Sequence, residues 1–221
     1  MSVWAILAAA GRGDRLGLDR PKAFAPLNDR PLIAESLERL DGSAWVEGIV
    51  VAAPPEWEEP CILVAEEVAA GKVAGTVTGG ETRSESVRAA LAEVPEEATV
   101  VLVHDAARPL VTDALIERLV TALADGWDGV VPALPVSDAV KRVEGEAVVE
   151  SVDRDALVTV QTPQAFVASV LRQALEGDVS NAPDCASLVG ARGGRVRVVE
   201  GDPKLVKITT PADLALVASW L

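Results

Sequence analysis

The stretch from Ala5 to Phe24, AILAAAGRGDRLGLDRPKAF, begins as an apolar run and continues as a loop rich in glycine and cations. Glycine occupies positions 11, 13 and 17, and residues 12–22 hold four of the 20 lysines and arginines of a chain whose formal net charge is −14. A buried strand that opens into a glycine-rich turn exposes backbone N–H groups, which favour phosphate. The stretch therefore predicts the first strand of an α/β domain and, beside it, a site for a strongly anionic ligand.

On either side of this loop, apolar runs alternate with amphipathic ones along the chain. This alternation predicts a Rossmann-like α/β fold, with a mostly parallel sheet flanked by helices. Ligands of such sheets bind beyond the carboxyl ends of the strands, so the glycine loop and HDAARP at 104–109 are expected to share one cleft. We expect strands at 3–9, 48–53, 73–77, 99–104, 129–133 and 195–199, and helices at 31–40, 56–70, 84–93, 112–124, 163–175 and 210–221.

Residues 135–160 interrupt the alternation with two valine-rich segments on either side of Glu144-Gly145-Glu146. The pattern predicts a β-hairpin arm that projects from the sheet. A bare two-stranded hairpin is marginally stable in water, so an arm this apolar needs a surface to pack against. We therefore expect a dimerisation arm. Its valines stand at positions 136, 140, 143, 148, 149 and 152.

Composition excludes several classes of partner. With 49% hydrophobic residues but only 3% aromatic ones, the core must be built from Ala, Val and Leu, as is typical of parallel strands covered by helices. A sequence pI near 4.5 argues against nucleic acid or an anionic membrane as a partner, since both need a broad basic face. Cys61 and Cys185 form no C-x-x-C pattern, and the first residues lack the features of a signal peptide, so we expect a cytoplasmic protein.

The glycine spacing by itself does not define a nucleotide site. Gly11-x-Gly13-x-x-x-Gly17 matches neither the dinucleotide-binding nor the P-loop pattern. In combination with five other motifs, however, the chain resembles the 2-C-methyl-D-erythritol 4-phosphate cytidylyltransferase family from residue 5 to about residue 216. The motifs that carry this resemblance are AAAGRGDRLG (8–17), RPKAF (20–24), GGETRSESV (79–87), VHDAARP (103–109), VQTPQAF (160–166) and VKITTPADL (206–214).

The resemblance implies a single nucleotidyltransferase domain over residues 1–221, with 135–160 as the dimerisation arm of a homodimer. The implied reaction transfers the cytidylyl group of CTP to methylerythritol phosphate in non-mevalonate isoprenoid synthesis, with Mg²⁺ as cofactor. The attacking phosphate oxygen is already anionic, so no general base is needed, and the single histidine of the chain agrees with this. Positioning and cations then carry the catalysis.

The resemblance also implies a role for particular residues. Arg15 and Lys22 would stabilise charge at the α-phosphate, while Arg154 and Lys207 would position the acceptor phosphate. His104 is expected to be structural and Arg108 to brace its loop, whereas Arg83 either assists the site or lies on the surface. The residues expected at the nucleotide are Ala9, Ala10, Gly11, Gly80, Glu81, Ser86 and Asp105, the last of which would face the ribose or Mg²⁺.

Two departures from the family pattern concern the acceptor. Ala139 and Pro183 stand where the family usually has threonine, so two hydroxyl donors next to the acceptor phosphate are absent. The acceptor could therefore be ribitol phosphate or another alditol phosphate. A catalytically silent nucleotide-binding regulator is the alternative from another class. The chain keeps residues on both sides of the site, among them Lys22 and Lys207, and this argues against a silent regulator.

Overall fold

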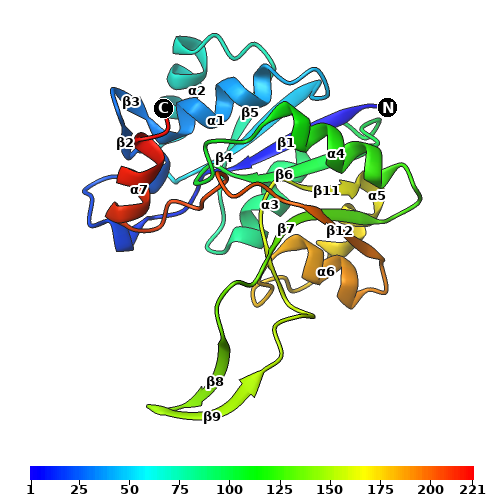
Figure 1. Ribbon diagram of the computed structural model, residues 1–221. Helices are drawn as coiled ribbons and strands as arrows, with labels where there is room; N and C mark the ends of the chain where they lie inside the picture. Colours follow the sequence, from blue (N-terminus) through cyan, green and yellow to red (C-terminus); the bar gives the residue numbers. More distant parts are fainter.

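The computed structural model describes residues 1–221 and is built around one eight-stranded sheet (Figure 1). The strand order is β10-β7-β11-β6-β1-β4-β5, with β12 on the other edge of β7. Neighbours among β1, β4, β5 and β6 are parallel, as are β7 and β12, which confirms the mostly parallel Rossmann-like sheet. The strands are β1 (Val3–Ala8), β4 (Gly48–Ala53), β5 (Val73–Thr78), β6 (Val100–Asp105), β7 (Gly129–Pro135), β10 (Val158–Val160), β11 (Gln164–Val167) and β12 (Val196–Glu200).

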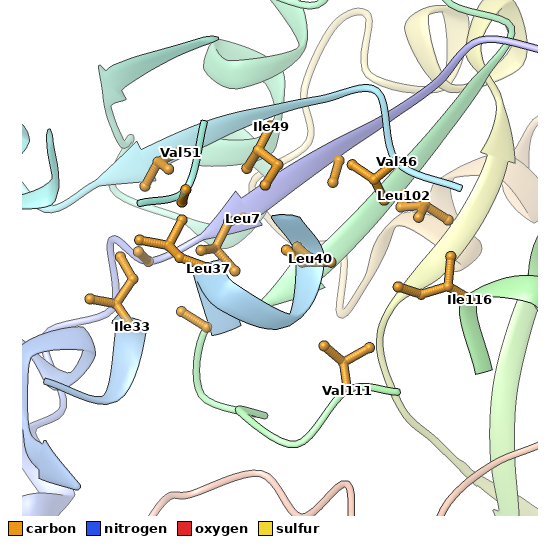
Figure 2. Close-up of a cluster of buried hydrophobic side chains, with 14 of the residues drawn as sticks. Leu7, Ile33, Leu37, Leu40, Val46, Ile49, Val51, Leu102, Val111 and Ile116 are labelled. Atoms are coloured by element: carbon orange, nitrogen blue, oxygen red, sulfur yellow. The ribbon is translucent and has the colours of Figure 1, made fainter. Parts of the chain in front are cut away.

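Side-chain alternation along the strands creates one core on each face of the sheet. In β1, Val3, Ala5 and Leu7 point into the larger core and Ile6 into the smaller one, as the two-residue period of a strand requires. Figure 2 shows α1 covering the larger core, with Leu37 and Leu40 over the sheet. The larger core is covered by α1 (Leu32–Asp41), α2 (Glu58–Glu67) and α4 (Asp113–Leu123), and the smaller by α3 (Arg83–Ala92), α5 (Ala168–Ala174) and α6 (Cys185–Ala191).

Helix caps fix the ends of several of these elements. The Thr112 hydroxyl accepts from the Leu115 amide and so caps α4, at the start of the helix expected over 112–124. The last helix, α7 (Pro211–Ala218), begins with a capping box between Thr210 and Asp213. It buries Val217 in a small third cluster with Leu16 from the glycine loop. None of the helices has the length and apolarity needed to span a membrane.

The prediction of one helix over 163–175 is wrong at its start. Residues Gln164–Val167 form β11, which runs antiparallel between β6 and β7 before α5 begins. Phe166 is fully buried there, and a Cβ on the facing Gly129 would lie 2.8 Å from its ring. The apolar spacing of this segment also fits a helix, so only the non-local pairing selects a strand. The short helix α6, capped by Asp184, was not predicted.

The predicted hairpin arm is confirmed as a structural element. Strands β8 (Val140–Glu144) and β9 (Ala147–Val152) pair antiparallel and project from the body beyond β7 and β10 (Figure 1). Val143 and Val148 lie opposite each other and are 58% and 62% exposed. The arm therefore presents apolar side chains that this chain itself does not cover.

Candidate active site

A cleft of about 840 Å³ lies beyond the carboxyl ends of β1, β4, β5 and β6. The glycine loop follows β1, and the segment starting at Ala106 follows β6, so the expectation that both motifs share one cleft is confirmed. The predicted site residues that line it are Ala9, Ala10, Gly11, Arg15, Lys22, Gly80, Glu81, Ser86, Asp105 and Lys207.

The glycine loop folds back on itself and brings Lys22 against its own start. A short 3-10 helix, η1 (Asp14–Leu16), lies between Gly13 and Gly17, whose φ angles are 79° and 65°. A Cβ on Gly13 would lie 2.6 Å from the Lys22 Cβ, so both the left-handed backbone and the close approach require glycine there. The Lys22 amide, at the start of η2 (Lys22–Phe24), donates to the Gly11 carbonyl.

The GGETRSESV motif supplies the start of α3 to the opposite side of the cleft. The Thr82 hydroxyl accepts from the Glu85 amide, and the Glu85 carboxylate accepts from the Thr82 amide, forming a capping box. Thr82 is thus the residue that caps the helix. The Ser86 hydroxyl instead donates to the Thr82 carbonyl. The positive end of the α3 dipole thus faces a cleft that already carries cations.

Asp105 is the central acidic residue of the cleft. Its Oδ1 lies 2.7 Å from Arg83 Nε and its Oδ2 lies 2.7 Å from Lys207 Nζ. Burial alone would raise the pKa of Asp105, but the charges of Arg83 and Lys207 outweigh it and hold this pKa well below its usual range. The Asp105 carboxylate is therefore ionised at neutral pH.

His104 and Arg108 support this site from behind. The His104 ring is fully buried, with Nε2 at 3.0 Å from the Arg108 carbonyl and Nδ1 at 3.1 Å from Thr162 Oγ1. Burial lowers the pKa of His104 to about 4, so the ring is neutral. Arg108 Nη1 donates to the Leu205 carbonyl. Both residues are placed as expected, His104 as a structural side chain and Arg108 as a brace between loops.

Lys22 lies in a surplus of positive charge. Burial, together with the neighbouring charges of Lys207, Arg15 and Arg108, lowers the pKa of Lys22 to about 8 against the opposing influence of Asp105. Cations this close together repel one another and destabilise the free protein until an anion binds between them. The cleft is therefore built for a polyanion such as a triphosphate.

The remaining acceptor-side residues are not brought to the cleft within this chain. Ala139 precedes β8, and Arg154, between β9 and β10, donates to the Ser137 carbonyl. Pro183 lies before α6, where the next residue, Asp184, accepts from Gln164 Nε2 at 2.8 Å. Of the predicted acceptor-binding residues, Lys207 alone lines the cleft.

Several cleft residues were missed by the sequence analysis. Pro54, Pro55 and Trp57 follow β4 and line the cleft, with the Trp57 ring packed on Phe24 at a centroid distance of 4.5 Å. Because these residues follow the strand predicted over 48–53, the rule that ligands bind beyond strand ends could have placed them at the cleft. For Arg83, the sequence allows either a site role or a surface role. It lines the cleft with a side chain only 23% exposed.

The donors at the cleft determine which kind of Mg²⁺ site it can form. The chain has no group of three or more His, Cys, Asp or Glu side chains placed to hold a metal ion. Mg²⁺ commonly binds through one or two carboxylates together with substrate phosphates and water. The ionised Asp105 in a phosphate-sized cleft fits that mode and does not fit a resident, all-protein site.

Residues 3–221 match the family model described as "IspD: 2-C-methyl-D-erythritol 4-phosphate cytidylyltransferase". The chain belongs to this cytidylyltransferase family. The protein of that name from Nocardia farcinica is 46% identical over 221 residues, covering 100% of this chain and 94% of the relative. The one from Saccharopolyspora erythraea is 44% identical and covers 100% of both chains.

Solved structures of cytidylyltransferases agree with this assignment. The 2-C-methyl-D-erythritol 4-phosphate cytidylyltransferase of Francisella tularensis superimposes with a TM-score of 0.83 at 30% identity, covering 100% of this chain and 99% of that one. The Thermus thermophilus protein of the same name gives a TM-score of 0.78 at 35% identity, covering 100% and 98%. The resemblance seen in the sequence motifs is thereby confirmed across the whole cytidylyltransferase fold.

Proposed function

We propose that this chain transfers the cytidylyl group of CTP to 2-C-methyl-D-erythritol 4-phosphate, releasing pyrophosphate, in non-mevalonate isoprenoid biosynthesis. The observation that carries the proposal is the match of residues 3–221 to the cytidylyltransferase family. The polyanion-binding cleft supports it, because Arg15, Lys22 and Lys207 surround one space between the glycine loop and the end of β6.

The chemistry needs charge stabilisation more than proton transfer. An oxygen of the acceptor phosphate attacks the α-phosphorus of CTP, a new P–O bond forms, and the bond to the β-phosphate oxygen breaks as pyrophosphate leaves. Lys22 and Arg15 would stabilise the charge that develops at the α-phosphoryl group, and Lys207 with Arg154 would hold the acceptor. His104 takes no part, because both its ring nitrogens are bonded inside the protein.

Mg²⁺ belongs to the same proposal. When bound, the ion would neutralise charge on the triphosphate and on the departing pyrophosphate. Asp105 is the residue that would hold it, as the one ionised carboxylate buried at the cleft. Ala9, Ala10, Gly11, Gly80, Glu81 and Ser86 would position the nucleotide from the two loops on either side of that carboxylate.

Purified protein should release pyrophosphate when CTP, Mg²⁺ and methylerythritol phosphate are mixed, and chelation of Mg²⁺ should stop the release. A coupled pyrophosphate assay measures it. Ribitol 5-phosphate, tested beside it, should react much more slowly, although Ala139 and Pro183 remove two hydroxyls expected near the acceptor. Faster turnover of ribitol phosphate would overturn the acceptor assignment. No release with any alditol phosphate would favour the silent regulator.

We also propose a cytoplasmic homodimer in which the arm of each subunit packs on its partner. The exposed valines of the arm support this, since Val143, Val148 and Val149 are 58%, 62% and 48% exposed. In such a dimer Arg154 would act in the partner's cleft, which agrees with its absence from the cleft of its own chain. Both cysteines are free and buried, as suits a reducing compartment.

Mixing two inactive variants tests the shared site. Arg154→Ala and Lys22→Ala subunits should each be nearly inactive, and their mixture should recover activity, because each hybrid dimer would contain one site that lacks neither residue. Subunit exchange is verified with two affinity tags. A mixture that exchanges but stays inactive would place Arg154 in its own subunit's site or outside catalysis.

CTP binding should be accompanied by proton uptake near pH 8. The pKa of Lys22 is lowered to about 8 in the free cleft, and a triphosphate would raise it again, so roughly half a proton should be taken up at that pH. Calorimetry at pH 8 in buffers of different ionisation enthalpy measures the uptake. The control is Lys22→Arg, which keeps the charge but does not titrate, and equal uptake by this variant would refute the assignment.

A further inference from the structure

The two cations that flank Asp105 differ in how firmly the protein holds them. Arg83 Nε and Lys207 Nζ each lie 2.7 Å from one carboxylate oxygen, but the Arg83 side chain is 23% exposed and that of Lys207 is 41% exposed. Arg83 has a second contact, from Nη1 to the Cys185 sulfur at 3.7 Å, whereas the Lys207 ammonium is bonded to Asp105 alone.

The backbones of both residues are held by hydrogen bonds, so the difference lies in the side chains. Arg83 is the first residue of α3 and lies inside the capping box, between Thr82 and Glu85, which fixes the start of the helix. Lys207 lies between β12 and α7, where the amide of the buried Ile208 donates to the Ala107 carbonyl, and it reaches the cleft on a long flexible side chain. Arg83 is therefore the rigid partner of Asp105, and Lys207 is the one that can leave.

Arg83 also has a donor to spare. Its Nη2 is buried and has no hydrogen-bond partner. Nε and Nη2 are the pair of donors with which a guanidinium grips a carboxylate side-on through two parallel hydrogen bonds. If Lys207 departs, Arg83 Nη2 can donate to the Asp105 oxygen that is set free, so the carboxylate stays compensated. Each carboxylate oxygen still keeps a second lone pair, with which it could hold Mg²⁺.

We propose that Arg83 is a positioning residue which remains the permanent counterion of Asp105 and thereby releases Lys207 to bind the acceptor phosphate. This inference rests on the proposed transferase function. A buried carboxylate needs at least one cation. Without Arg83, Lys207 would be the sole hydrogen-bonded counterion of Asp105, and an incoming phosphate would have to pull it away.

Steady-state kinetics of Arg83→Gln should therefore show a selective effect. The KM for the alditol phosphate should rise by at least about tenfold, as befits a charge-assisted hydrogen bond, with kcat and the KM for CTP within about threefold. Arg83→Lys keeps the charge but lacks the second donor, so it should restore part of the acceptor KM. Arg88→Gln, on the same helix with an exposed bond to the Gly177 carbonyl, is the matched control and should behave as wild type.

A second readout does not require turnover. Inorganic phosphate is titrated into protein with ¹³C-dimethylated lysines, and the Lys207 resonance, assigned with Lys207→Arg, is followed by NMR. Arg83→Gln should need at least about tenfold more phosphate than wild type for the same shift. An unchanged titration overturns the proposal even if the enzyme is active. Equal changes in kcat and both KM values, or an Arg83→Lys variant no better than Arg83→Gln, also overturn it. Failure of the wild type to turn over any acceptor counts against the proposed function only.

Discussion

Lys22→Ala should lower kcat by about 10²-fold or more while the protein stays folded. Removing one preorganised charge that acts on the transition state typically has an effect of this order, and kcat and kcat/KM should fall together. The closed glycine loop holds the Lys22 backbone in place, with its amide bonded to the Gly11 carbonyl. Steady-state kinetics with saturating CTP measures the loss.

The stability of that variant separates a catalytic role from misfolding. The folded pKa of Lys22, about 8, lies below its ordinary value, so the charged form is disfavoured in the folded protein. This penalty is fully present below pH 8 and fades as the pH rises towards 10. Lys22→Ala should thus unfold at the same temperature as wild type or higher at pH 7. Arg20→Ala, 49% exposed and outside the cleft, should leave kcat unchanged. If the kcat of Lys22→Ala is within a few-fold of the wild-type value, Lys22 is an ordinary surface charge.

Asp105→Asn should be the most destabilising polar substitution in the cleft. It leaves the Arg83 and Lys207 charges without the buried carboxylate that compensates both. Breaking a buried ion pair from one side destabilises by about 3–5 kcal/mol, which for a chain of this size lowers Tm by about 10 °C. Calorimetric or fluorescence melting at pH 7 measures the shift.

The pH dependence and an exposed ion pair provide the controls for Asp105. Its folded pKa is depressed, so its contribution is fully present above an unfolded pKa of about 4 and is lost as the pH falls below that. The gap in Tm between wild type and Asp105→Asn should therefore persist at pH 6. Asp19→Asn, which breaks a pair whose Asp side chain is 83% exposed, should change Tm by less than about 2 °C. An Asp105→Asn shift no larger than that would show that the pairing with Arg83 and Lys207 contributes little.

Much of the first half of the fold could be predicted because its signals are local. The strand expected over 48–53 has the bounds of β4. The helix expected from residue 112 begins with Thr112 as its cap. β11 could not be found in the same way. QAFV continues into an apolar pattern of helical spacing, and what makes it a strand is pairing with β6, some 60 residues earlier in the sequence.

The candidate site shows a similar division. The glycine loop and Asp105 could be placed at one cleft from the rule that ligands bind at the carboxyl ends of parallel strands. Arg83 could not be assigned, because its partners Asp105 and Cys185 come from distant segments that meet only in the folded chain. The role of Arg154 stays a prediction, since it depends on a second subunit.

The position of β11 between β6 and β7 has a consequence for the order in which the newly made chain can assemble. Strands β1, β4, β5 and β6 are neighbours that pair with one another, so this half of the sheet can close while later residues are still being synthesised. β7 must wait for residues 164–167 to return from the arm before it can join the edge of β6. Until then β6 presents an unpaired edge, with which a strand of another chain could pair and aggregate. The loop that holds Lys22 is thus formed early in the life of the chain, and the segment that delivers Lys207 closes the cleft last.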